Sequence, residues 1–162
     1  MTLRHHALVG TVGCFILFVT GLSAQTLQII DADGKSTTLT AAQISNLPRV
    51  SVNTVEHDVP AQFEGVSVAS VLAIAGIQMG DKLRGPRMAE VLLVEAADGY
   101  KVVFALAELD PAFATREIVL ADKRDGKQLD SKQGPFRVVA PGDKRPARWI
   151  RQVLKMQLTT VK

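Results

Sequence analysis

The sequence predicts an α+β domain with a mixed β-sheet and short helices. Three observations support this fold class. Several short segments alternate apolar and polar side chains, which is typical of half-buried strands. Asp-Gly turn signals join two pairs of these segments into hairpins. Helix-capping signals precede only short stretches, so the helices are expected to be few and brief.

The first expected elements are a hairpin and a short capped helix. Residues 26–31 and 36–40 both alternate and flank a turn that ends in Asp-Gly, which predicts antiparallel strands. Thr40 and Gln43 have the spacing of a capping box. One or two helical turns should therefore follow Thr40 and end before Pro48, because the residue before a proline disfavours helix.

The next segment combines a strand with an apolar helix. Arg49–Glu56 alternates and predicts a strand, whereas residues 57–65 are expected to form a loop. Ser67 is a suitable N-cap for an apolar helix over residues 68–75. Gly76 follows at the position that favours left-handed backbone, so the helix should end there.

A second hairpin dominates the middle of the chain. Residues 80–87 are polar and basic and predict a loop. Residues 90–95 and 100–106 flank a turn over 96–99 that ends in Asp-Gly, which predicts a hairpin. A short helical or turn segment is expected over residues 106–113, where Pro111 interrupts it.

The C-terminal part is expected to hold mainly strands. Residues 118–121 and 136–140 are short apolar runs that predict buried strands. Residues 149–153 predict a helical turn, and residues 155–161 a final strand.

We predict a signal peptide over residues 1–24 and a single domain over residues 25–162. Arg4 precedes an almost wholly apolar stretch, residues 7–22, and small residues stand near the expected cleavage point after Ala24. The apolar stretch is short for a membrane span of about 20 residues, so no stable anchor is expected after cleavage. An uncleaved anchor is the alternative. The expected location is periplasmic or secreted.

Several classes of chemistry are excluded by composition and motifs. Cleavage removes Cys14, the only cysteine, and with it any disulfide, thiolate nucleophile or cysteine metal ligand. His57 is then the only histidine, which argues against a catalytic zinc site or a serine-type triad. Glu56 and His57 are adjacent on a strand and point to opposite faces, so they form no ready acid–base pair. No phosphate-binding glycine motif and no nucleic-acid-binding motif is present.

Charge is distributed unevenly along the chain. Residues 25–122 contain 7 basic and 13 acidic residues, whereas residues 123–162 contain 11 and 3. This asymmetry indicates an anionic partner for the basic part, or two halves that face each other. A solvated basic face is the plainer alternative. Nucleic acid is not an expected partner of an exported chain.

The most crowded basic stretch is residues 134–149 (GPFRVVAPGDKRPARW). It contains a single acidic residue, and its cations surround two prolines and a glycine. A Pro/Gly turn presents backbone N–H groups, and guanidinium groups bind phosphate oxygens in pairs. The stretch therefore predicts either a solvated loop or a site for a negatively charged ligand. Its cations are Arg137, Lys144, Arg145 and Arg148.

Four segments in a fixed order carry a family resemblance. They are FEGVSVASVLAIAGI (63–77), ADGYKVVFALAEL (97–109), DGKQLDSKQGPFRVVAPGD (125–143) and ARWIRQVLKMQL (147–158). Together they resemble the molybdopterin-binding domain of the sulfite oxidase family over most of residues 45–158. The chain is similar to small, exported, single-domain members. The resemblance implies an oxidoreductase-type domain with molybdopterin as its cofactor.

The resemblance also implies candidate cofactor-binding residues. In the family, the segment matching residues 134–149 lies against the pterin and its phosphate. Arg137, Gly142 and Arg148 match family positions there, Lys144 and Arg145 lie between them, and His57 follows the strand where the family's site opens. Four of these residues have an alternative. Arg137 could form an ion pair with an upstream acidic residue, the two loop cations could be solvated, and His57 could be a plain surface histidine.

The chain departs from the family at the metal ligand. The family's cysteine should stand within residues 50–57, which contain none; Thr54 is the nearest match, followed by Val55. A neutral hydroxyl is a poor substitute for a thiolate. We therefore assign no metal ligand and no catalytic residue, and expect ordinary sulfite or sulfoxide turnover to be absent. The alternative function is a cofactor-free binding or interaction module whose basic face meets a small oxyanion, an acidic protein or a redox partner.

Overall fold

A computed structural model describes residues 25–161. The predicted signal peptide, with Cys14, lies outside the described residues. Within them, no helix is both long and apolar enough to cross a membrane.

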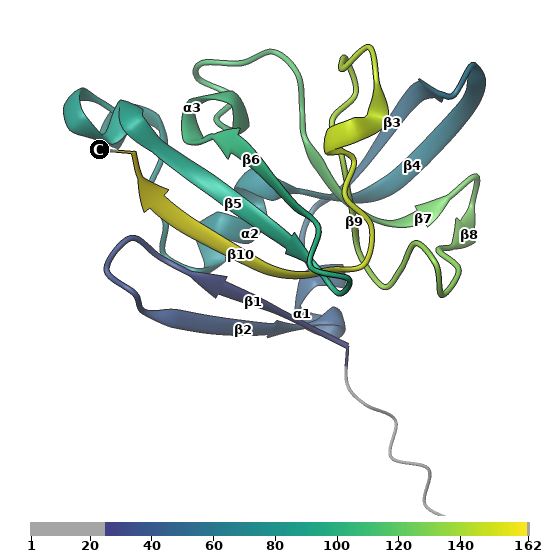
Figure 1. Cartoon of the computed structure of the whole chain (residues 1–162), viewed down its shortest axis with the longest axis horizontal. Coiled ribbons are helices and arrows are strands. Elements are labelled where there is room, and N and C mark those ends of the chain that lie inside the picture. The colour runs from purple at the N-terminus through teal and green to yellow at the C-terminus, as the bar shows by residue number, and fades with distance from the viewer. Residues whose placement is uncertain (1–24, 162) are drawn as a thin grey trace, which may run out of the picture.

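The described chain forms two five-stranded sheets. The first, sheet A, has the order β2-β1-β10-β5-β6. β1 and β10 are parallel and the other neighbours are antiparallel, so sheet A is mixed. It occupies the left of Figure 1. Its strands are β1 (Thr26–Ile30), β2 (Ser36–Thr40), β5 (Glu90–Ala96), β6 (Lys101–Ala105) and β10 (Val153–Thr160).

Sheet B lies beside it and is antiparallel throughout. Its order is β3-β4-β7-β8, and β9 pairs with β7. The β3–β4 hairpin extends to the upper right of Figure 1. The strands are β3 (Arg49–Glu56), β4 (Val59–Ser67), β7 (Val119–Arg124), β8 (Lys127–Gln128) and β9 (Arg137–Val139).

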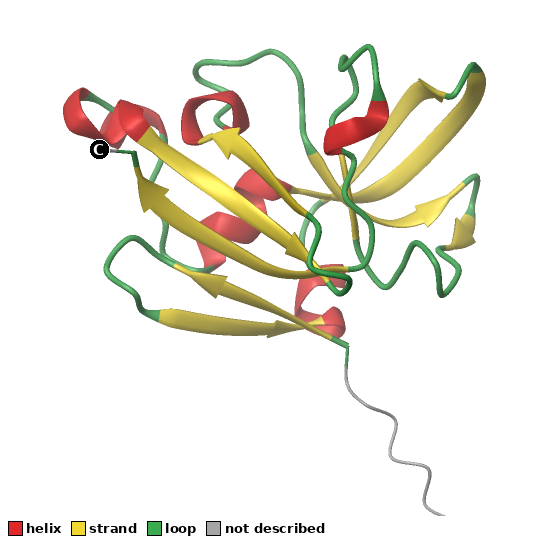
Figure 2. Cartoon of the chain, viewed as in Figure 1, coloured by secondary structure: helices red, strands yellow, loops and turns green. Residues whose placement is uncertain are grey.

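Helices are few and short, as Figure 2 shows. Thr40 forms the predicted capping box with Gln43, and the Ser67 hydroxyl accepts the Ser70 N–H at 3.0 Å. Gly76, with φ of 83°, follows the second helix in the expected left-handed region. The α+β fold class is thus confirmed. The helices are α1 (Ala41–Ser45), α2 (Val68–Ile74) and α3 (Leu106–Leu109), and 3₁₀ turns are η1 (Gly80–Lys82), η2 (Gly85–Ala89) and η3 (Pro146–Arg148).

The two sheets share one hydrophobic core. Phe63 of β4 and Trp149 meet edge to face with ring centroids 6.0 Å apart, and both are buried. The Trp149 Nε1–H donates to the Ala140 carbonyl at 2.9 Å, which satisfies the indole donor inside the core. Trp149 therefore has the core position expected from the sequence.

The predicted loop over residues 57–65 is wrong. This segment is mostly β4, which pairs with β3 from Arg49↔Val66 to Glu56↔Val59. His57 and Asp58 form a two-residue turn with φ of 50° and 66°. Such turns usually carry Asn-Gly or Asp-Gly, so His-Asp gave no hairpin signal.

The predicted helical turn over residues 149–153 is also displaced. The turn is η3, which begins at Pro146, because proline suits the first position of a helical segment. Strand β10 begins at Val153, two residues before the predicted start. The sequence predicted one mixed sheet, whereas the strands of the described residues belong to two sheets.

Candidate functional site

A large open cavity lies where both sheets present their loops. Its volume is about 1210 Å³. It is lined by the β3–β4 turn, the β5–β6 turn, the β8–β9 loop and the segment from Gly142 to Gln152. Pockets for small molecules usually measure about 300–1,000 Å³, so this one can receive a ligand of cofactor size.

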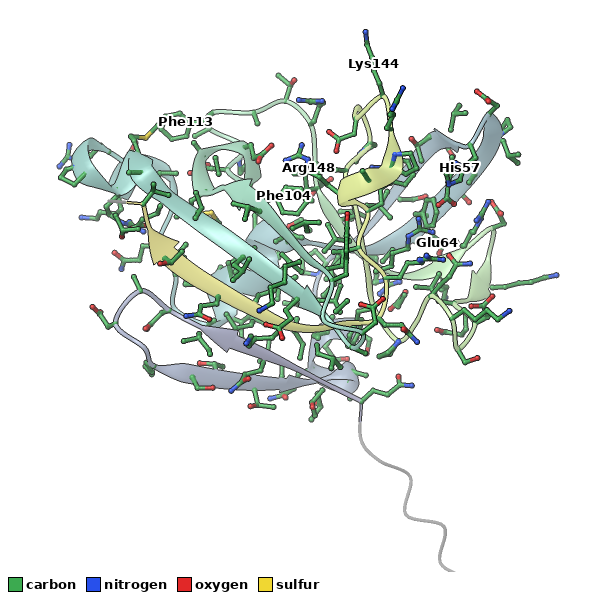
Figure 3. The ribbon with its side chains drawn as sticks, in the orientation of Figure 1. His57, Glu64, Phe104, Phe113, Lys144 and Arg148 are labelled. Atoms are coloured by element: carbon green, nitrogen blue, oxygen red, sulfur yellow. The ribbon has the colours of Figure 1, made fainter. Side chains whose placement is uncertain are left out.

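The cavity brings together most of the predicted site residues. Arg137, Gly142, Lys144, Arg145 and His57 all line it. Thr54, the nearest match to the family's cysteine, lines it as well. Figure 3 labels His57, Lys144 and Arg148 around this region. Arg148 is the one predicted residue outside the lining.

Arg137 is bound within the protein by an acidic residue. Its guanidinium forms an ion pair with Glu56 and donates through Nη1 to Gln133 Oε1 at 2.7 Å. Only 3% of Arg137 is exposed. The guanidinium carbon lies 5.1 Å from the Phe63 ring centroid and 5.9 Å from that of Trp149. The structure thus shows the ion pair that the sequence left as the alternative for Arg137.

Glu56 sits at the centre of this charge network. Its carboxylate also accepts from Arg124 Nη1 at 2.8 Å. Burial alone would raise the pKa of Glu56, but the hydrogen bond from Arg137 and the charges of Arg137 and Arg124 outweigh it and hold that pKa below its ordinary value. Glu56 is therefore a carboxylate that balances buried arginine, and it is not poised to take up a proton near neutral pH.

Arg148 is held by two carboxylates. It donates to Asp143 through Nε and Nη2 at 3.0 and 2.9 Å, and to Glu108 through Nη1 at 3.0 Å. Its guanidinium lies over the Phe104 ring, 4.7 Å from the centroid (Figure 3). The hydrogen bond with Asp143 is the main cause of a raised pKa of Arg148. Arg148 therefore links the loop that contains it, residues 141–148, to α3 and β6.

Two further contacts fix the same loop. The Tyr100 hydroxyl donates to the Ala147 carbonyl at 3.0 Å, which links the β5–β6 turn to η3. The Arg116 side chain packs directly over Gly142. Residues 141–148, which we call the basic loop, are thus tied to three separate parts of the fold.

Gly142 should not tolerate a side chain. Its φ is 131°, and a Cβ there would lie 2.5 Å from Arg116 Cδ and 2.7 Å from Nη1. We expect Gly142→Ala to lower the free energy of unfolding by about 1–3 kcal/mol, because it adds backbone strain and displaces Arg116. Urea unfolding measures this loss. Gly142→Ala with wild-type stability would contradict the described loop conformation.

Four cations remain at the cavity without an acidic partner. Lys132, Lys144, Arg145 and Arg151 line it, are exposed, and make no side-chain hydrogen bond or ion pair within residues 25–161. Lys144 and Arg145 were predicted from the sequence as binding residues. Lys132 and Arg151 were not, because their only signal was the charge excess after residue 122.

The donor set does not suit a thiolate-ligated metal. Across the described residues, His, Cys, Asp and Glu side chains form no group of three or more that could hold a metal ion. Thr54 offers the cavity a neutral hydroxyl where the family resemblance places a thiolate. Thr54 is thus a poor ligand for such a metal, whereas the exposed cations of the lining can contact an anion.

Comparison with known proteins gives a fold relationship. No family model matches the sequence, and no curated protein matches it. Among solved structures, the chain is similar to the sulfane dehydrogenase SoxCD from Paracoccus pantotrophus, with a TM-score of 0.65 and 17% sequence identity. The match covers 83% of this chain and 38% of that one, so this chain spans well under half of the neighbour. The likeness supports a distant fold relationship, and membership of the sulfite oxidase family stays a prediction.

Proposed function

We propose that this protein is an exported, oxidoreductase-type domain that binds an anionic, pterin-like cofactor in the cavity without conventional oxo transfer. The observation that carries the proposal is the unpaired cations of the basic loop. Lys144 and Arg145 line a cavity of cofactor size, and neither has a carboxylate partner within the described chain. Exposed cations that line a cavity without an acidic partner favour an anionic ligand.

The anchoring of the basic loop supports binding there. Tyr100, Arg116 and Glu108 contact it from three other parts of the fold, so its backbone is positioned before any ligand arrives. Preorganisation reduces the entropy lost on binding. Each hydrogen bond to a charged group contributes roughly 1.5–3 kcal/mol, so several bonds to one phosphate would suffice for retention.

The proposal assigns different roles to the arginines matched by the resemblance. Glu56 already neutralises Arg137, and two carboxylates already bind Arg148. Neither guanidinium needs a ligand for charge balance. We therefore place the cofactor's phosphate at Lys144 and Arg145. Arg137 is treated as a structural residue of the cavity lining, and Arg148 as a residue that fixes the basic loop. A molybdopterin, when bound, would bring redox chemistry that these side chains do not supply.

Cofactor retention tests the proposal directly. The protein would be purified from a host that makes molybdopterin, and its molybdenum content and the pterin fluorescence after denaturation would be measured. We expect about one pterin per chain, and a loss of at least about tenfold in retention for the variant Lys144→Glu/Arg145→Glu, because charge reversal repels the phosphate. The matched control is Lys35→Glu/Lys82→Glu, which reverses two exposed cations outside the cavity lining.

A cofactor-free binding module is the second candidate. The ion pair between Glu56 and Arg137 favours it, because the arginine matched to the family's phosphate contact is already neutralised. An empty preparation from a competent host would support this reading and would contradict pterin binding. Retention unchanged in the Lys144/Arg145 variant would remove the assigned phosphate position.

A further inference from the structure

The four unpaired cations of the cavity form two pairs on different segments. Lys144 and Arg145 belong to the basic loop, which Figure 1 shows at the top of the view with η3. Lys132 lies in the β8–β9 loop and Arg151 just before β10. The β8–β9 loop runs along the lower right of the same view. The four cations thus belong to separate segments of the cavity lining.

Hydrogen bonds unite the segments that carry the second pair. The Gln152 N–H donates to the Gln133 carbonyl at 2.9 Å, and Gln152 Nε2 donates to the Ser131 carbonyl at 2.7 Å. Lys132 and Arg151 each adjoin a residue of these bonds. The backbones of Lys132 and Arg151 therefore lie on two segments that hydrogen bonds join to each other.

We propose that the cavity takes a small molecule bearing a diphosphate, with one phosphate at Lys144 and Arg145 and the other at Lys132 and Arg151. The inference deepens the proposed function: it rests on anion binding in this cavity and names the anion. A diphosphate carries more negative charge than a single phosphate, so cations on separate segments of the lining favour it.

The charges of the lining agree with this ligand class. Two carboxylates of the lining already form ion pairs. Glu56 pairs with Arg137 and Arg124, and Asp143 pairs with Arg148. Asp58 and Asp98, on the two hairpin turns, are the other acidic residues of the lining. Four cations without partners in the described structure thus face two carboxylates, which leaves a positive excess for an anion. Lys144 points away from the protein body (Figure 3), and its flexible stem lets the ammonium turn toward a bound phosphate.

A series of inorganic phosphates tests the proposal on the purified protein. Isothermal titration calorimetry would compare orthophosphate, pyrophosphate and tripolyphosphate at one fixed salt concentration. We expect pyrophosphate to bind at least about tenfold more tightly than orthophosphate, because it engages both pairs. Lys144→Ala/Arg145→Ala and Lys132→Ala/Arg151→Ala should each reduce pyrophosphate affinity to about the orthophosphate level. The control Lys35→Ala/Lys82→Ala should bind like the wild type, and circular dichroism would verify folding of all variants.

The possible results separate this inference from the proposed function. Equal affinity for orthophosphate and pyrophosphate, or dependence on the Lys144 pair alone, would overturn the diphosphate assignment and leave pterin binding intact. An equal loss in the control variant would show nonspecific attraction and overturn it as well. If no phosphate binds and the protein from a competent host is also empty, both proposals fail.

Discussion

Replacing Glu56 by alanine is expected to lower the free energy of unfolding by about 3–5 kcal/mol. The carboxylate is the counter-charge of Arg137, of which only 3% is exposed, and it also binds Arg124. Without Glu56 the Arg137 guanidinium would stay buried between Phe63 and Trp149 with no negative partner. Urea unfolding monitored by Trp149 fluorescence measures the change.

An exposed ion pair supplies the control. Arg49 and Asp122 also join distant segments, but 36% of the Arg49 side chain is exposed. The Asp122 side chain keeps 17% of its surface in contact with water, so Arg49→Ala does not leave a fully buried charge and should cost about 1 kcal/mol. Glu56→Leu/Arg137→Met removes both buried charges and should recover much of the loss. If Glu56→Ala cost no more than Arg49→Ala, the network would not be the buried one described here.

Anion affinity and stability of the same variants show whether Arg137 has mainly a structural role or mainly a ligand-binding role. If its guanidinium served mainly to bind a ligand, then Glu56→Ala would free it and increase affinity for anions. Since Glu56 and Arg137 are both buried and line the cavity, we expect the reverse: a less stable protein with weaker anion binding. The stability measurement thus decides how a loss of binding should be read.

The sequence predicted correctly those strands, helix caps and turns that depend only on residues close to one another in the chain. Arg49–Glu56 alternates along its whole length because one face of β3 is more solvent-exposed, and the predicted strand has the observed bounds. The capping box at Thr40 and the Asp-Gly turn before Tyr100 use neighbouring residues only. Such features can be predicted from the sequence without knowledge of tertiary contacts.

The site could be predicted only in part, because its partners are distant in sequence. Glu56 and Arg137 are 81 residues apart, and no periodicity links them. The crowding of cations in residues 134–149 indicated the basic loop. It could not show that Arg148 would be bound by Glu108, or that Lys132 and Arg151 would reach the same cavity. Those outcomes depend on how the sheets meet.

Gly65→Ala is expected to lower the free energy of unfolding by about 3 kcal/mol. Gly65 lies in β4 between Val50 of β3 and Ala121 of β7. A Cβ at Gly65 would clash with the Leu120 carbonyl oxygen and would lie 2.6 Å from the Ala121 Cα. These are backbone atoms of a central strand, so no side chain can rotate aside and the sheet itself must shift.

The comparison variant is Gly34→Ala. Gly34 has φ of 84° but no atom within 4 Å of an added Cβ, so it tests backbone strain alone and should cost about 1 kcal/mol. Thermal and urea unfolding of both variants would measure the difference. A cost for Gly65→Ala no greater than for Gly34→Ala would contradict the close β4–β7 pairing. Arg124 is a residue of β7, and its pairing with β4 positions it for the ion pair with Glu56. A shift of β7 should therefore disturb this charge network and the cavity as well as the sheet.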